Sequence, residues 1–201
     1  ASKSFKENNQ IFNSLRQCMG VIGKIIVSLM PFAPKFLVKR IAGRYVAGSE
    51  LESAIDLMKG MSKENTCFTI DVLGEEINDL EEARYFVDEY SRVLDSIVSN
   101  QINANISLKP TAFGLLIDKN VALSNIEEIL KKAASNDIFV RLDMEDHRVT
   151  QETIDVVLEM QEKGFQNIGT VLQGRLFRTK DDIAEISKKL GPITDFRICK
   201  G

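Results

Sequence analysis

The chain has 201 residues, enough to bury one sizeable hydrophobic core or a core with an appendage. Hydrophobic residues make up 44% of it and charged residues 27%, which is typical of a soluble globular protein. The net charge of −3 argues against nucleic acid as a partner.

The three cysteines are Cys18, Cys67 and Cys199, which lie far apart and form no CxxC motif. Neither a disulfide framework nor a zinc site is therefore predicted. We expect a reducing, cytoplasmic compartment.

The first part of the chain is predicted to form a helical arm. Apolar residues recur at helical spacing over residues 5–43, with a break at Pro31, and a further helix is predicted over residues 51–61. We therefore expect an N-terminal helical arm over residues 1–62 and a main domain over residues 63–201.

The most apolar region covers residues 19–37, but Lys24 and Pro31 interrupt it. Its longest uncharged run is shorter than the roughly 20 residues needed to cross a bilayer. A peripheral contact with the inner membrane face is an alternative, because amphipathic surfaces of this kind lie in the interface. The side chains that would make this contact are Ile25, Ile26, Leu29, Met30 and Phe32.

From Thr66 onward, predicted strands and helices alternate along the chain. The strands are predicted at residues 66–73, 104–109, 138–144, 167–172 and 194–200. The helices between them are predicted at residues 80–100, 122–136, 150–163 and 180–189. Strands that alternate with amphipathic helices pair in parallel through right-handed crossovers, so the predicted class is α/β.

Two α/β architectures fit this order, a doubly wound open sheet and a (β/α)8 TIM-type barrel. An open sheet of the dinucleotide-binding kind would carry a G-x-G-x-x-G motif after its first strand, and none follows residues 72–74. Polar or charged residues lie at or just past the C-terminal end of every predicted strand, and a barrel gathers such ends around one pocket. The sequence therefore favours the barrel.

A closed barrel of this type needs eight strands, and only the first five β/α units are predicted here. A half-open sheet would expose two edges and a flank of its core. Two explanations stay open: the sequence is part of a longer protein, or a complementing chain supplies the remaining strands.

Lys109 ends the second predicted strand, because Pro110 cannot donate a ladder hydrogen bond. It is predicted to be a cation, or a lysine of lowered pKa, that faces a substrate; a Schiff-base lysine and a solvated strand-end lysine are the alternatives. A half-buried lysine needs an anionic partner, and Asp143 and Glu145 end the next strand.

The run from Asp143 to His147 places three carboxylates and the single histidine of the chain at one strand end. A metal site formed by Asp143, Glu145, Asp146 and His147 is one interpretation. The simpler one is that these carboxylates cap the next helix and that His147 lies exposed in a loop, so no metal is predicted.

Polar side chains also end the fourth and fifth predicted strands. Gln173 carries an amide that both donates and accepts hydrogen bonds, which suits the edge of a heterocycle such as a flavin or a pterin. Arg197 and Lys200 provide cations for a phosphate or an electron-rich ring. Strict alternation places them on opposite faces, unless the strand ends before Lys200.

Six short stretches carry a more specific signal when they are taken together. They are Tyr45-Val46-Ala47-Gly48, Thr69-Ile70-Asp71-Val72-Leu73-Gly74-Glu75, Ile106-Ser107-Leu108-Lys109-Pro110-Thr111, Leu142-Asp143-Met144-Glu145, Val171-Leu172-Gln173 and Arg197-Ile198-Cys199-Lys200-Gly201. In this order they resemble the proline dehydrogenase family in its small monofunctional bacterial form.

The resemblance implies a distorted (β/α)8 barrel that binds FAD and oxidises L-proline to Δ1-pyrroline-5-carboxylate, the first step of proline catabolism. A hydride passes from the ring carbon next to nitrogen to flavin N5, and the electrons pass on to a quinone or another acceptor. The predicted partial barrel over residues 63–201 would then be the FAD- and proline-binding domain.

The resemblance also implies roles for single residues. Lys109 would form part of the substrate carboxylate site, Asp143 would lie beside the flavin and substrate pocket, and Glu75 would be a gate residue that pairs with an arginine. The residues that would hold the flavin are Gln173, Arg197 and Lys200, with Arg197 close to N5. Those that would line it are Val171, Cys199 and Gly201.

The sequence departs from the family pattern in two respects. The last three strands and the final helix, which carries the arginines for the substrate carboxylate and for the gate, have no counterpart in these residues, nor has part of the FAD adenosine and pyrophosphate site. Gly174-Arg175 follows Gln173, where many members carry a small residue and an aromatic one, so the resemblance assigns no role to Arg175.

Overall fold

A computed structural model describes residues 23, 47–48, 50–191 and 194–201. The chain divides into two compact units, residues 1–49 and residues 50–201. The side chains predicted to contact a membrane lie outside the described residues. Within the described ranges, no helix combines the length and the apolar character needed to cross a bilayer.

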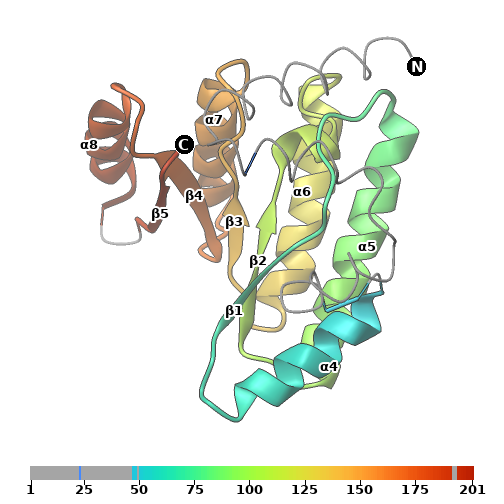
Figure 1. Cartoon of the computed structure of the whole chain (residues 1–201). Coiled ribbons are helices and arrows are strands. Elements are labelled where there is room, and N and C mark those ends of the chain that lie inside the picture. Colours follow the sequence, from blue (N-terminus) through green and yellow to red (C-terminus); the bar gives the residue numbers. More distant parts are fainter. Residues whose placement is uncertain (1–22, 24–46, 49, 192–193) are drawn as a thin grey trace. The chain divides into compact units, whose positions relative to one another are not determined.

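The described residues of the second unit form an alternating series of strands and helices (Figure 1). The elements are α4 (Leu51–Ser62), β1 (Phe68–Asp71), α5 (Leu80–Ser99), β2 (Ala104–Leu108), the 3-10 helix η2 (Pro110–Phe113), α6 (Lys119–Ala134), β3 (Val140–Leu142), α7 (Thr150–Glu162), β4 (Ile168–Gln173), α8 (Thr179–Leu190) and β5 (Phe196–Cys199). The predicted α/β order is confirmed, but β1, β2, β3 and β5 are shorter than predicted and β4 is not.

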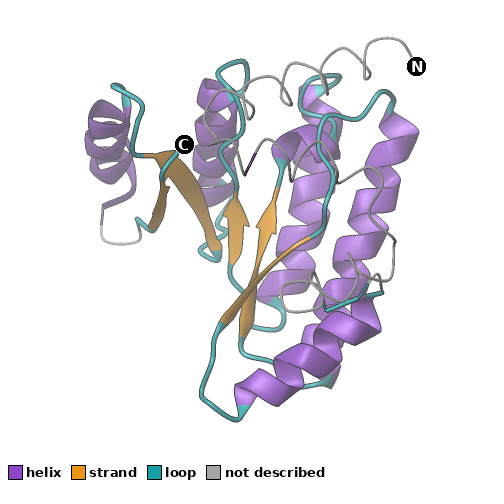
Figure 2. Ribbon diagram, in the orientation of Figure 1, coloured by secondary structure: helices purple, strands orange, loops and turns teal. Residues whose placement is uncertain are grey.

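The five strands form one parallel sheet in sequence order, β1-β2-β3-β4-β5. Helices α5, α6 and α7 lie along one side of β2 and β3 (Figures 1 and 2). Each strand thus lies beside the next one along the chain, with a helix in the connection, which is the arrangement of a (β/α) barrel. The strands form a half-barrel, and the predicted fold class is confirmed.

We call the side of the sheet that packs against the helices the outer face. Five of its strand residues are apolar and have no exposed surface: Ile106, Leu108, Val140, Leu142 and Ile168. They form one core cluster with side chains of α5 and α6, among them Tyr90, Leu94 and Ile126. Because side chains alternate along a strand, the residues between them point to the opposite side, which we call the inner face.

Helix α4 packs with the sheet, although the sequence analysis grouped it with the arm. Ile55 and Met58 of this helix form a buried cluster with Ile102, against which Phe68 and Ala104 also pack. The compact unit accordingly begins at Glu50 rather than at residue 63. A helix that buries apolar side chains under the first two strands is part of their core, whatever its place in the chain order.

Two aspartates fix where the long helices begin. Asp79 precedes α5 and accepts hydrogen bonds from the backbone N–H groups of Glu81 and Glu82, at 3.0 and 3.1 Å. Asp118 does the same for α6. A side-chain oxygen at the N-cap pairs with backbone donors that have no partner inside the helix, so these helices start sharply at the rim of the half-barrel.

Candidate active site

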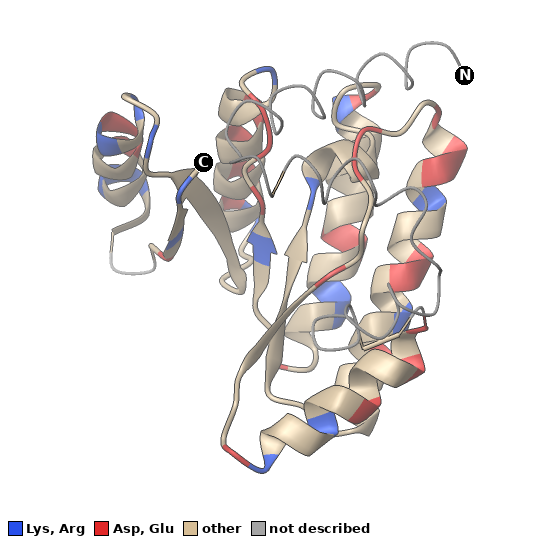
Figure 3. Ribbon diagram, in the orientation of Figure 1, with Lys and Arg blue, Asp and Glu red and all other residues tan. Residues whose placement is uncertain are grey.

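The inner face carries polar and charged side chains at the C-terminal ends of the strands. Charged residues mark β1, β3 and β5 as well as the outer surfaces of the helices (Figure 3). The inner-face residues at this rim are Asp71, Ser107, Lys109, Asp143, Gln173 and Arg197. The register supports this grouping, because Asp71 lies opposite Ser107 and Val171 opposite Arg197 on neighbouring strands.

Lys109 forms an ion pair with Asp71 at the end of β1. The distance from Nζ to Oδ2 is 2.5 Å, and the two side chains are 17% and 31% exposed. Burial lowers the pKa of the Lys109 ammonium, but the hydrogen bond and the charge of Asp71 outweigh it, helped by Asp143 and Glu75, so the net pKa is raised. Lys109 is therefore a cation here, which disfavours a lysine of lowered pKa or a Schiff-base lysine.

This pairing corrects one prediction. The sequence pattern predicts that Asp143 and Glu145, at the end of the following strand, are the partners of Lys109. The structure instead pairs Lys109 with the preceding strand, because Asp71 lies opposite Ser107 and the lysine is on the same face two residues further on. Asp143 acts on Lys109 through its charge only.

Arg197 extends from β5 across the inner face. Its Nη2 donates to Ser107 Oγ at 2.9 Å and to Asp143 Oδ1 at 3.1 Å, so one guanidinium links residues at the ends of three strands. Both side chains of the Arg197–Asp143 pair are about a third exposed. The site therefore contains two cation–carboxylate pairs, Lys109–Asp71 and Arg197–Asp143, and part of each remains accessible to a ligand.

Glu145 and Gln173 are held by a separate set of hydrogen bonds. The Glu145 carboxylate accepts from the Thr111 N–H at 3.0 Å and from its hydroxyl at 2.5 Å. Gln173 Nε2 donates to the backbone carbonyls of Met144 and Glu145, each at 3.3 Å. Burial raises the pKa of Glu145, although its bonds to Thr111 oppose this effect.

The carboxylates after β3 point to different partners. Asp146 pairs with Arg148 at 2.5 Å, while Asp143 pairs with Arg197 and Glu145 bonds to Thr111. Within the described part of the chain, no group of three His, Cys, Asp or Glu side chains is arranged to hold a metal ion.

Glu75 lines a pocket of about 320 Å³ at the rim, together with Glu76, Thr111, Glu145, Asp146 and Arg148. Arg148 pairs with Glu76 at 2.8 Å, and the Glu76 N–H donates to the Thr111 hydroxyl at 3.0 Å. Glu76, the residue after Glu75, is thus bound to the rim through both its backbone and its side chain.

The remaining predicted site residues lie along β4 and β5. Val171 is fully buried opposite Arg197, and Cys199 is partly buried. Strand β5 ends at Cys199, so Lys200 lies in the following loop and is exposed, which frees it from the strand alternation. A β-carbon on Gly201 would lie 2.8 Å from Cβ of Gln173, so this glycine permits a close approach.

Sequence reasoning missed three residues that organise this rim. Ser107 and Thr111 bond directly to predicted site residues, and Tyr90 bonds to Asp71. Ser107 was detectable, because it lies two residues before Lys109 and alternation puts both on one face. Tyr90 carried no such signal, since an aromatic residue on the apolar side of a helix is expected simply to fill the core.

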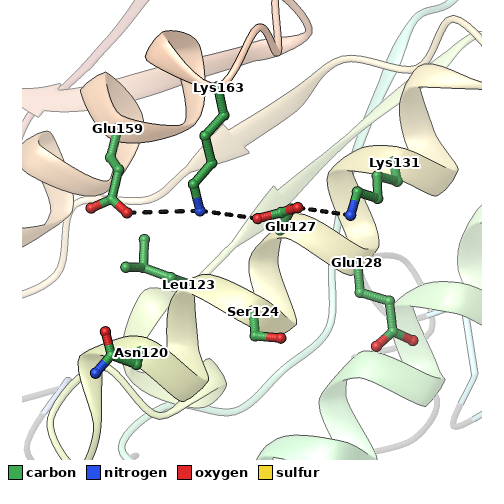
Figure 4. Close-up of a pocket in the computed structure, with 8 residues that line it drawn as sticks. All are labelled: Asn120, Leu123, Ser124, Glu127, Glu128, Lys131, Glu159 and Lys163. Carbon is green, nitrogen blue, oxygen red and sulfur yellow. Dashed lines mark hydrogen bonds and ion pairs between the residues drawn. The ribbon is translucent and has the colours of Figure 1, made fainter.

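A second hollow, of about 390 Å³, lies on the outer surface between α6 and α7 (Figure 4). Glu127 binds Lys131 at 2.7 Å and Lys163 at 3.0 Å, and Lys163 also contacts Glu159 at 3.8 Å. These charges neutralise one another at an exposed surface of the helices, and none of the inner-face rim residues lines this hollow. We therefore place the candidate active site at the inner rim.

Comparison with known proteins connects this chain to one family. The profile of the proline dehydrogenase family matches residues 54–201. Proline dehydrogenase 1 of Bacillus subtilis (strain 168) is 33% identical over 174 residues, which cover 87% of this chain and 56% of the relative. Proline dehydrogenase of Deinococcus radiodurans is 32% identical over 154 residues, which cover 73% of this chain and 48% of the relative.

Solved structures show the same fold. The crystal structure of proline utilization A from Bdellovibrio bacteriovorus, inactivated by N-propargylglycine, superposes with a TM-score of 0.76 at 24% identity. The match covers 86% of this chain and 21% of that chain. This chain spans about half the length of the curated relatives it matches. The profile match and the identity to the curated relatives show that the chain belongs to the proline dehydrogenase family.

Proposed function

We propose that this chain contributes the flavin-binding residues and some of the substrate-binding residues of an FAD-dependent proline dehydrogenase. The reaction is the oxidation of L-proline to Δ1-pyrroline-5-carboxylate, with the electrons passed on to a quinone or another acceptor. Family membership supports the proposal. The observation that carries it is the inner rim itself, where the cations Lys109 and Arg197 face one side of the half-barrel, each on a carboxylate partner.

The residues at this rim fit a flavin. Gln173 already donates its Nε2 to two backbone carbonyls, which leaves its amide oxygen as the acceptor for a ring N–H group. Arg197 would hold positive charge beside the ring, Lys200 would bind phosphate from the exposed loop, and Val171, Cys199 and Gly201 would line the ring. Bound FAD would supply the acceptor for the hydride that leaves the proline carbon next to nitrogen.

The substrate side of the proposal rests on Lys109. Its ammonium, held by Asp71, would donate to the carboxylate of L-proline and fix the ring relative to the flavin. Asp143 would keep the guanidinium of Arg197 in place between the flavin and the substrate. Glu75, in the rim pocket, would close over bound substrate by pairing with an arginine outside these residues.

The half-barrel leaves room for the rest of the site. We propose that activity requires the remaining barrel strands, supplied either by further sequence of the same protein or by a complementing chain. The chain on its own is then catalytically inactive. L-proline added to the purified chain with FAD should leave the visible absorbance of the flavin unchanged, and bleaching of the flavin by the chain alone would show that the remaining strands are not required.

Substitution of Arg197 tests the proposed function in the protein with a complete barrel. Arg197→Met removes the charge beside the ring, so we expect weaker flavin binding and flavin reduction by L-proline slowed about 100-fold, a size typical of losing one electrostatic contact to a developing charge. Visible absorbance gives both quantities.

The control is Arg141→Met, which removes an arginine from the same face nearer the N-terminal ends of the strands, where it pairs with Asp195 at 2.6 Å. We expect this variant to keep its flavin and its rate of reduction. A yellow, proline-reducible Arg197→Met enzyme with unchanged rates would count decisively against the proposed function.

A further inference from the structure

Tyr90 extends from helix α5 to the ends of β1 and β2. It is 1% exposed, and its ring lies against Phe113 with the ring centroids 5.6 Å apart. Its hydroxyl accepts a hydrogen bond from the Val72 N–H at 3.1 Å and lies 2.6 Å from the Ser107 carbonyl oxygen. The same hydroxyl lies 3.0 Å from Asp71 Oδ1.

The position of this hydroxyl interrupts the ladder between the two strands. In this register the Phe68 N–H donates to the Asn103 carbonyl, and each rung of a parallel ladder repeats two residues further along both strands. Two repeats later, the Val72 N–H would meet the Ser107 carbonyl. The Tyr90 hydroxyl stands between these two groups and bridges them, which explains why β1 ends at Asp71 instead of continuing to residue 73.

The bridge also reaches the Lys109 ion pair. The single proton of the hydroxyl is shared between the Ser107 carbonyl and Asp71 Oδ1, while Asp71 Oδ2 binds Lys109 Nζ at 2.5 Å. Burial, followed by the nearby charge of Asp71, raises the pKa of Tyr90 far above its usual value, so the hydroxyl stays protonated and remains a donor. One oxygen of Asp71 is therefore fixed by the outer layer of the fold and the other by the inner-face lysine.

We propose that Tyr90 is the positioning residue of Lys109. Its hydroxyl separates the ends of β1 and β2 by one bridging atom and orients Asp71, which in turn directs the lysine ammonium toward the substrate carboxylate. The proposal rests on the substrate-binding role proposed above for Lys109. It assigns no chemical step to Tyr90, whose side chain is 1% exposed.

The test is Tyr90→Phe in the flavin-loaded protein with a complete barrel. The variant keeps the ring in the core and removes only the bridging oxygen. We expect the KM for L-proline to rise about 10-fold, as for the loss of a charge-assisted hydrogen bond, with kcat changed by less than about threefold and flavin content unchanged. Tyr85→Phe is the matched control, because Tyr85 lies on the same helix but is 59% exposed, and its KM should equal that of the wild type.

A double-mutant cycle separates positioning from a purely structural role. Asp71→Asn should raise KM by itself, and the Tyr90→Phe, Asp71→Asn double variant should raise it by less than the product of the two effects, because both act through Lys109. Independent effects on KM, or a Tyr90→Phe variant that loses thermal stability with KM unchanged, would overturn the positioning role.

Hydrogen exchange tests the bridge itself without reference to activity. The Val72 amide should exchange faster in Tyr90→Phe than in the wild type and at the same rate in Tyr85→Phe; equal rates in all three proteins would show that no bridge exists. A wild-type protein whose flavin L-proline does not reduce would overturn the proposed function, whereas an active wild type with an unaltered Tyr90→Phe KM overturns only the role of Tyr90.

Discussion

The two faces of the half-barrel sheet are built from alternate residues of the same short strands. On the outer face, Leu108 and Leu142 have no exposed surface and pack beneath the helices. On the inner face, the very next residues, Lys109 and Asp143, keep part of their charge accessible. Successive residues along the chain thus have two different roles, packing in the core and forming the charged rim, because a pleated backbone turns successive side chains to opposite sides.

The two faces differ in what they contribute to stability. A fully buried leucine contributes about 2–3 kcal/mol through removal of its apolar surface from water. A partly exposed ion pair contributes about 0–1 kcal/mol, because water and salt screen it. Substitutions on the outer face should therefore change the free energy of unfolding, and those on the inner face should change activity.

Replacement of Lys109 should have the largest effect on the inner face. Lys109→Met retains the aliphatic stem but removes the charge that would bind the substrate carboxylate. We expect kcat/KM for L-proline to fall about 1000-fold, on the order of 4 kcal/mol, with the free energy of unfolding within about 1 kcal/mol of the wild type. Steady-state kinetics and urea unfolding of the complete barrel measure the two quantities.

Lys132→Met provides the control, because Lys132 binds Asp95 on the outer helices. It should leave kcat/KM unchanged. If Lys109→Met unfolded far more readily than the wild type while its kcat/KM stayed the same, the division between the two faces would be wrong.

Much of the fold could be predicted from sequence, because it depends on local patterns. Alternating strand and helix segments gave the α/β class and the parallel order, and absence of a glycine-rich motif favoured the barrel. The strand ends were less predictable. Strand β1 was predicted over residues 66–73 but spans Phe68–Asp71, since the Tyr90 hydroxyl replaces its next rung, and no pattern near Val72 reveals this.

The positions of the rim residues could be predicted from the sequence, but their pairing could not. The sequence identified the rim cations Lys109 and Arg197 from their positions at strand ends. It assigned Lys109 the wrong partner, because choosing between Asp71 and Asp143 requires the register and the direction of a long side chain. The roles of these residues came from the resemblance to a family and stay predictions until the substitutions above are measured.

Truncation of Leu142 tests the outer face. Leu142→Ala leaves a cavity between β3 and the helices, so we expect the free energy of unfolding to fall by about 3 kcal/mol. The matched control is Ile198→Ala on β5, where the side chain is 52% exposed, and it should cost less than about 1 kcal/mol. Urea unfolding measures both. Equal losses would mean that the outer face is not the core on which the sheet depends.

The smallest expected effect concerns Glu145, which lies past the C-terminal end of β3. It is a carboxylate at the active-site rim, yet burial raises its pKa above the usual value of 4.5, while its bonds to Thr111 oppose the shift. Because the folded protein then holds this proton more tightly than the unfolded chain does, the contribution of Glu145 to stability is fully present below about pH 4.5 and is lost as the pH rises through the raised pKa.

Glu145→Gln removes this titration and keeps the shape of the side chain. We expect the difference in unfolding free energy, wild type minus variant, to fall as the pH rises from about 4.5 through the raised pKa and to stay constant above it. Thermal or urea unfolding at a series of pH values measures the difference, and Glu152→Gln on the exposed side of α7 serves as the control. A difference that instead grew with pH would mean that the bonds from Thr111 outweigh burial, and Glu145 would then act as an ordinary stabilising carboxylate of the inner rim.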